Sequence, residues 1–127
     1  MVTHGRLGHE LLAAAEMIVG EVSHMAAVSI GWHDDVENSR REIEEAIEIV
    51  DADRGIIILT DMFGGTPSNL SLSLLGRDEL EIVTGVNLPM VIKAATQKGG
   101  QSVGELASEV EEQGRKQIAL TSKLLEQ

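Results

Sequence analysis

The chain has no cysteine, and it is poor in aromatic and in basic side chains. Without thiols, disulfide bonds, thiol catalysis and zinc–thiolate sites are excluded. One Trp, one Phe and no Tyr leave too few rings for a surface that stacks nucleic-acid bases. Ten Lys and Arg against 21 Asp and Glu give a formal net charge of −11. Nucleic acid and anionic membrane surfaces are therefore poor partners, whereas a basic protein partner suits this charge.

Long apolar runs are missing as well. No stretch is long and apolar enough to cross a bilayer, so no direct membrane insertion is expected, and the first residues lack the pattern of a signal peptide. What is present is 43% hydrophobic residues over 127 positions, which suits one domain with an ordinary aliphatic core. We expect residues 1–127 to form a single domain.

Strand-like and helix-like segments alternate along the chain, which predicts an α/β domain with a mostly parallel sheet. The expected strands are 1–3, 26–30, 56–60 and 80–84, and the expected helices are 6–19, 36–50, 67–75, 89–96 and 103–115. Segment 67–75 also shows alternating leucines, as strands do. Pro67 in front and Gly76 behind favour a helix. The tail after Arg115 fits either a strand or a helix.

The most informative segment is 60–69, Thr-Asp-Met-Phe-Gly-Gly-Thr-Pro-Ser-Asn, which follows the apolar run 56–59. Gly64 and Gly65 allow backbone N–H groups to converge on a ligand. Pro67 fits the first turn of a helix, whose N-terminus favours negative charge. Together these features predict an anion site, to which the Thr66 hydroxyl could contribute.

This segment lacks a nucleophile, and His4 supplies a candidate from the other end of the chain. Both His4 and Asp61 follow predicted strands, and ligands of open α/β sheets bind at the carboxyl ends of strands. If strands 1–3 and 56–60 are neighbours, the two side chains face one crevice. A carboxylate that accepts one imidazole N–H leaves the other nitrogen free to act as a nucleophile. The helix start after Gly5 would help to offset the charge of a phosphoryl group.

Each signal has a simpler interpretation when taken alone. A single His near a chain end is usually an exposed polar residue, and Asp61 fits a helix cap or a turn. His33, Asp34 and Asp35 resemble a metal site, but their spacing matches no established ligand pattern, and helix initiation by Asp explains them better. We expect no metal. His9 is expected to be an exposed surface residue, and His24 shows no evident role.

Three blocks of sequence together resemble a known family. Residues 2–5 (Val-Thr-His-Gly) with 10–20, residues 60–69, and residues 84–90 (Thr-Gly-Val-Asn-Leu-Pro-Met) are similar to the mannose-type IIA domain of the bacterial phosphoenolpyruvate-dependent sugar phosphotransferase system. The three blocks occur in the right order, and the similarity covers nearly the whole chain. The resemblance implies a doubly wound α/β sheet with helices on both faces.

It also implies a cytoplasmic phosphocarrier that needs no cofactor. The histidine-containing phosphocarrier protein, phosphorylated by enzyme I, would pass a phosphoryl group to Nε2 of His4, and His4 would pass it to a IIB domain or protein. Asp61 would bond the other ring nitrogen, and Thr3 and Thr66 match polar positions lining the family's site. Apart from the resemblance, the apolar residues Met62 and Phe63 after Asp61 could be part of the core or could equally form a docking rim for a partner. A homodimer is implied, with an edge strand exchanged between subunits, which the tail would have to supply.

Two departures leave questions open. The family usually has a whole apolar strand before its Thr-His-Gly, whereas this sequence has only Met1 and Val2 there. We predict that the native protein starts upstream of Met1, and an intact mass that begins at Met1 would contradict this. Many relatives carry a IIB domain after the IIA domain, and the printed sequence ends at Gln127, so the cognate IIB stays open. Alternatives to transport are a regulatory module whose phosphorylation state selects its partners, and a small-molecule binding domain without covalent chemistry.

Overall fold

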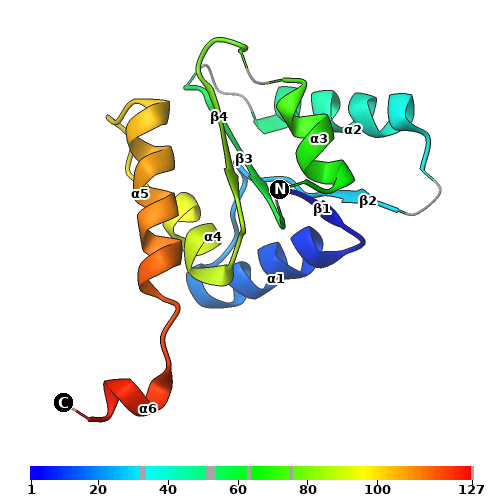
Figure 1. Cartoon of the computed structure of the whole chain (residues 1–127). Coiled ribbons are helices and arrows are strands. Elements are labelled where there is room, and N and C mark those ends of the chain that lie inside the picture. The colour runs from blue at the N-terminus through cyan, green and yellow to red at the C-terminus, as the bar shows by residue number, and fades with distance from the viewer. Residues whose placement is uncertain (32–33, 51–53, 63, 75, 127) are drawn as a thin grey trace.

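The computed structural model describes residues 1–31, 34–50, 54–62, 64–74 and 76–126. The described residues form four strands and six helices that alternate along the first two thirds of the chain (Figure 1). The strands are β1 (Val2–His4), β2 (Val28–Ile30), β3 (Ile56–Thr60) and β4 (Leu80–Thr84). The helices are α1 (Leu7–Val19), α2 (Val36–Val50), α3 (Thr66–Leu72), α4 (Leu88–Ala95), α5 (Val103–Lys116) and α6 (Thr121–Leu124).

The four strands form one sheet in the order β2-β1-β3-β4, and each pair of neighbours is parallel. From β1 the chain crosses to one side to form β2, and from β3 it continues to the other side to form β4. The strand order therefore reverses between β1 and β3. In open α/β sheets the crevice at this reversal is where ligands bind.

Helices cover both faces of the sheet (Figure 1). On one face α2 supplies Ile43 and Ile47 and α3 supplies Leu70 to a core cluster that includes Ile56, Ile58 and, from the turn after α3, Leu74. On the other face α1, α4 and α5 enclose a second cluster, which contains Ala15, Leu59, Val83, Met90, Val91, Ala107 and Val110. Coverage on both faces explains why the central strand β3 is almost continuously apolar. The predicted doubly wound fold is confirmed.

Local signals decide the helix boundaries. Segment 66–72 is a helix, as Pro67 and Gly76 predicted, and it starts after Gly65. The side chain of Asn87 accepts a hydrogen bond from the N–H of Met90 and caps α4. Ser102 caps α5 in the same way, by accepting from the N–H of Glu105. These caps satisfy N–H groups that a helix start otherwise leaves free.

The tail is helical at Thr121–Leu124, so of the two possibilities left open the helix is the one observed. It projects from the end of α5 away from the sheet (Figure 1). Its apolar side chains are uncovered: Ile118, Leu120, Leu124 and Leu125 are all exposed. None of the helices in the described ranges is long and apolar enough to cross a membrane.

Apolar residues recur at helical spacing in α1, at Leu7, Leu11, Ala15 and Ile18, and in α2, at Val36, Ile43, Ile47 and Val50, and these stripes overstate how much of each helix is buried. Leu7 and Ile18 lie on the stripe of α1 and Val36 on that of α2, yet all three are exposed. Leu7 and Val36 begin their helices and Ile18 is next to the end of α1. The stripe of α1 is buried only in its middle, at Ala15. His9, expected to be exposed, is half-buried, and its Nδ1 lies 3.0 Å from Oγ of Ser29.

Candidate active site

His4 is the last residue of β1 and stands at the carboxyl edge of the sheet. Val2 and Thr3 before it are buried, whereas 49% of the His4 side chain is exposed. Gly5 then turns the chain toward α1 with φ = 52°, a backbone conformation that favours glycine. The N–H of Gly5 donates to the carbonyl of Ile30 at 2.9 Å, which ties this turn to the end of β2.

Asp61 directly follows β3, the strand next to β1, and its carboxylate contacts His4 twice. Oδ2 accepts the backbone N–H of His4 at 3.0 Å and lies 2.8 Å from Nδ1 of the same residue. Oδ1 accepts the N–H of Met62 at 3.0 Å. The carboxylate is thus held at both oxygens, and residues 57 positions apart in the sequence share one crevice, as predicted.

This arrangement determines the charge of Asp61 and the tautomer of His4. Burial raises the pKa of Asp61, but the hydrogen bonds from the backbone and side chain of His4 outweigh it, so the pKa lies below its ordinary 3.8. An ionised carboxylate only accepts hydrogen bonds. Nδ1 of His4 must therefore carry the proton, which leaves the lone pair of the neutral ring on Nε2.

Gly65 faces the free side of the imidazole. An ideal Cβ at Gly65 would lie 2.7 Å from Cε1 of His4, closer than real Cβ atoms come, and 3.1 Å from Nε2, tighter than most Cβ contacts. Gly64 has φ = 92° and open space around it. Glycine is therefore favoured at the two positions for different reasons. At Gly64 the backbone has a positive φ, and at Gly65 a side chain would occupy the space of the His4 ring.

The predicted threonines behave differently from each other. Thr66 begins α3, one residue after Gly65. Thr3 is fully buried, and its Oγ1 accepts the N–H of Gly8 at 2.7 Å. The Thr3 hydroxyl thus supports the first turn of α1, and the role of Thr3 in the site stays a prediction. The N–H of Gly5 donates to the carbonyl of Ile30, and the role of Gly5 in phosphoryl binding also stays a prediction.

Gly8, whose N–H donates to the Thr3 hydroxyl, also supports the turn that carries His4, and the sequence did not predict this role. An ideal Cβ at Gly8 would lie 3.1 Å from Oγ1 of Thr3 and 3.3 Å from Cβ of Met1. The position of Gly8 in the first turn of a predicted helix, four residues after His4, could have indicated this contact. Glycine destabilises a helix, so its presence there suggests that close packing requires it. Phe63, one of the two residues of the predicted docking rim, lies outside the described residues, as does His33 of the rejected metal site.

A protein-family model described as "PTS system fructose IIA component" (EIIA-man), where PTS is the phosphotransferase system, matches residues 1–111. The chain belongs to the mannose family of PTS IIA domains. This IIA domain is 33% identical over 132 residues to the mannose-specific EIIAB component of Escherichia coli K12, an alignment that covers 98% of the chain and 39% of that protein. The chain therefore spans about two fifths of the length of the E. coli relative.

Shorter relatives match over most of their length. The IIA domain is 31% identical over 109 residues to the sorbose-specific EIIA component of Lacticaseibacillus casei, which covers 85% of the chain and 78% of that protein. The solved mannose/sorbose-specific IIA subunit from Enterococcus faecalis superimposes with a TM-score of 0.84 at 31% identity, covering 94% of the chain and 89% of the subunit. The chain is thus similar both to separate IIA components and to the IIA part of a longer sugar phosphotransferase protein.

Proposed function

We propose that His4 carries a phosphoryl group, which it accepts from the histidine-containing phosphocarrier protein and donates to a IIB domain or protein. One observation carries this proposal: Oδ2 of Asp61 lies 2.8 Å from Nδ1 of a half-exposed His4, so that Nε2 is left as the nucleophilic nitrogen. The membership of the IIA family supports the direction of the relay. The relay takes place in the cytoplasm, where its donor is phosphorylated.

The transfer is a displacement at phosphorus. The lone pair of Nε2 forms a bond to the phosphorus while the bond from phosphorus to the donor nitrogen breaks, and the donor nitrogen keeps that electron pair. Nδ1 of His4 keeps its proton. The ring therefore gains positive charge as the bond forms, and the adjacent Asp61 carboxylate stabilises it without accepting the proton. Donation to the IIB partner reverses these steps at Nε2.

Backbone N–H groups of Gly64, Gly65 and Thr66 hold the transferred phosphoryl oxygens in this proposal. Gly65 is next to Nε2, and the N–H groups at the start of α3 have no acceptor within the helix. Phosphoryl transfer relies on such positioned dipoles more than on covalent chemistry by the protein. Thr3 and Gly5 act indirectly, by holding the turn on which His4 stands.

Partners approach over an apolar rim. Met62 follows Asp61, is 56% exposed, and its Cγ would lie 3.7 Å from a Cβ at Gly65. Leu7, three residues after His4, is 45% exposed. Apolar side chains beside an exposed nucleophile provide the contact area that transfer between two proteins needs. The net charge of −11 favours basic partner surfaces.

The relay is tested by incubating the protein with phosphoenolpyruvate, enzyme I and the phosphocarrier protein. We expect one acid-labile phosphoryl group by intact mass, and its transfer to an added IIB protein. His4→Ala should abolish the modification, whereas His24→Gln, at an exposed histidine outside the site, should retain it. Phosphorylation that persists in His4→Ala would contradict the proposal.

We also propose that the apolar tail packs on a second copy of the chain. Ile118 and Leu125 are 77% and 80% exposed, which is unfavourable for a segment that stays in water. Deletion of residues 118–127 should convert a dimer into a monomer in light scattering coupled to size exclusion. A monomeric full-length chain at micromolar concentration would contradict this part of the proposal.

A further inference from the structure

Sulfur enters this chain through methionine alone, because it has five methionines and no cysteine. Peroxides oxidise an exposed thioether to a sulfoxide, and methionine sulfoxide reductases reverse the change. The side chains of Met62 and Met17 are exposed, at 56% and 88%, whereas Met90 is buried and Met1 and Met25 are half-buried. Met62 and Met17 are therefore the methionines that an oxidant in solution reaches first.

Met62 lies beside the nucleophilic nitrogen of His4. Its N–H donates to Oδ1 of Asp61 at 3.0 Å, which ties its backbone to the carboxylate that holds the imidazole. An ideal Cβ at Gly65 would have Nε2 of His4 at 3.1 Å and Cγ of Met62 at 3.7 Å as neighbours. The Met62 side chain and Nε2 therefore border the same space, in which the proposed phosphoryl group forms.

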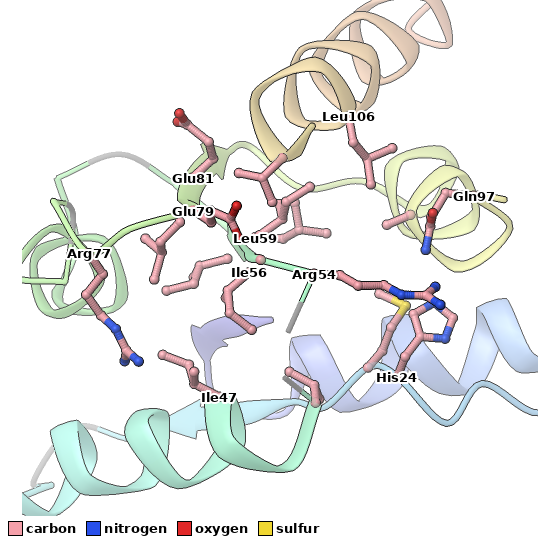
Figure 2. Close-up of a pocket in the computed structure, with 18 of the residues that line it drawn as sticks. His24, Ile47, Arg54, Ile56, Leu59, Arg77, Glu79, Glu81, Gln97 and Leu106 are labelled. Atoms are coloured by element: carbon pink, nitrogen blue, oxygen red, sulfur yellow. The ribbon is translucent and has the colours of Figure 1, made fainter. Parts of the chain in front are cut away.

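The other four methionines lie away from this space. Met17 is in the last turn of α1, at the far end of that helix from His4. Met1 and Met25 line a cleft at the amino end of the sheet (Figure 2), whereas His4 stands at the carboxyl edge. Met90 packs in the core cluster beneath α4 and α5. Met62 thus combines exposure with contact at the site, and Met17 is a natural control.

We propose that Met62 is a reversible oxidation site that controls the phosphorylation of His4, an inference that rests on the relay proposed above. The oxidant is a peroxide. The sulfur lone pair attacks one peroxide oxygen as the O–O bond breaks, and the leaving hydroxide takes the proton of the transferred oxygen and becomes water. The sulfur loses two electrons, which reduce the peroxide. A reductase reverses the step with two thiols, which become a disulfide while the oxygen leaves as water.

The sulfoxide opposes phosphorylation for an electrostatic reason. Its oxygen carries partial negative charge and only accepts hydrogen bonds, and the oxygens of a phosphoryl group are likewise negative acceptors. The two groups therefore repel each other beside Nε2 of His4, in a chain whose formal net charge is already −11. Oxidation also makes the Met62 side chain polar, which weakens the apolar rim for partners. Both effects lower the rate at which His4 is phosphorylated.

The test treats the wild type, Met62→Leu and Met17→Leu with hydrogen peroxide, removes the peroxide, and measures phosphorylation by the phosphocarrier protein. Peptide mass mapping gives the fraction of sulfoxide at each methionine. Each protein is compared with its own untreated sample, so that a changed basal rate in Met62→Leu does not affect the result. We expect the wild type and Met17→Leu to lose at least about tenfold in rate, and Met62→Leu to keep its own rate. The two epimer-specific sulfoxide reductases together should restore the wild type.

Four outcomes would overturn the proposal. These are a Met62 that stays unoxidised while Met17 reacts, sulfoxide at Met62 with an unchanged rate, an equal loss in Met62→Leu, and a loss that the reductases do not reverse.

A readout without a phosphoryl donor separates this proposal from the relay. The NMR signal of the Cε1–H of His4 should shift when Met62 is oxidised and should stay in place when Met62→Leu is treated. An unmoved signal in the oxidised wild type would count against the oxidation site even if the relay operates. Failure of the untreated wild type to be phosphorylated would bear on the relay, whereas the ring signal would still decide whether the sulfoxide acts on His4.

Discussion

Gly65 lies against the imidazole ring of His4 so closely that any side chain there would collide with it. A Cβ at Gly65 would be 2.7 Å from Cε1. Oδ2 of Asp61 is 2.8 Å from Nδ1 of the same ring. The imidazole therefore cannot retreat from an added methyl group without losing its carboxylate partner, and this constraint makes the position of the ring testable.

Gly65→Ala should reduce the rate of His4 phosphorylation at least about tenfold, because the methyl group displaces the ring or blocks Nε2. The matched control is Gly104→Ala, where a Cβ in α5 meets nothing within 4 Å. That variant should phosphorylate normally, and it should be more stable by about 0.5–1 kcal/mol because alanine favours helix. A normal rate in Gly65→Ala would show that the site tolerates a methyl group there. Rapid-quench phosphorylation and urea unfolding measure the two effects.

Asp61→Asn should slow phosphoryl transfer about a hundredfold or more while leaving the fold intact. An amide can donate to Nδ1 of His4, which favours the tautomer with its proton on Nε2, and it no longer balances the charge on the ring. Rapid-quench phosphorylation measures the rate, and far-ultraviolet circular dichroism checks the fold. Transfer at the wild-type rate would remove Asp61 from its assigned role.

Acid should weaken the fold through Asp61. Its folded-state pKa lies below the ordinary 3.8, so its stabilising contribution is present above that value and is lost as the pH falls through the folded-state pKa. The free energy of unfolding of the wild type, minus that of Asp61→Asn, should therefore decrease from about pH 5 to about pH 2. Urea titrations over that range measure it, and a difference that does not change with pH would contradict this linkage.

The amino group of Met1 should act in a separate pH window. Its folded pKa is lowered from 8.0 to about 6, so folding favours the neutral amine. The contribution of the neutral amine to the free energy of unfolding should be fully present above about pH 8. It should fall by about 2–3 kcal/mol as the pH drops to about 6. Acetylation of Met1 keeps the N–H that donates to Ala26 and removes the charge. The acetylated chain should lose this pH dependence, and an unchanged profile would contradict the assignment.

Most of the fold is predictable from local sequence, because strands and helices follow apolar periodicity and the positions of proline and glycine. The bounds of α2, β3 and β4 agree with prediction. Burial is less predictable, as exposed Leu7 and Ile18 show. A helix stripe indicates which side is apolar, but the extent of the sheet determines how much of that side is covered.

In the candidate site too, some features follow from local sequence and others only from the tertiary structure. Residue order alone placed His4 and Asp61 each after a strand and put two glycines before a helix, because these are local features of the chain. Whether the two side chains meet depended on β1 and β3 lying side by side, a pairing between segments 57 residues apart that no local pattern specifies. The same pairing buried the hydroxyl of Thr3 and brought Gly65 against the imidazole ring, since both depend on how the strands and helices pack in three dimensions.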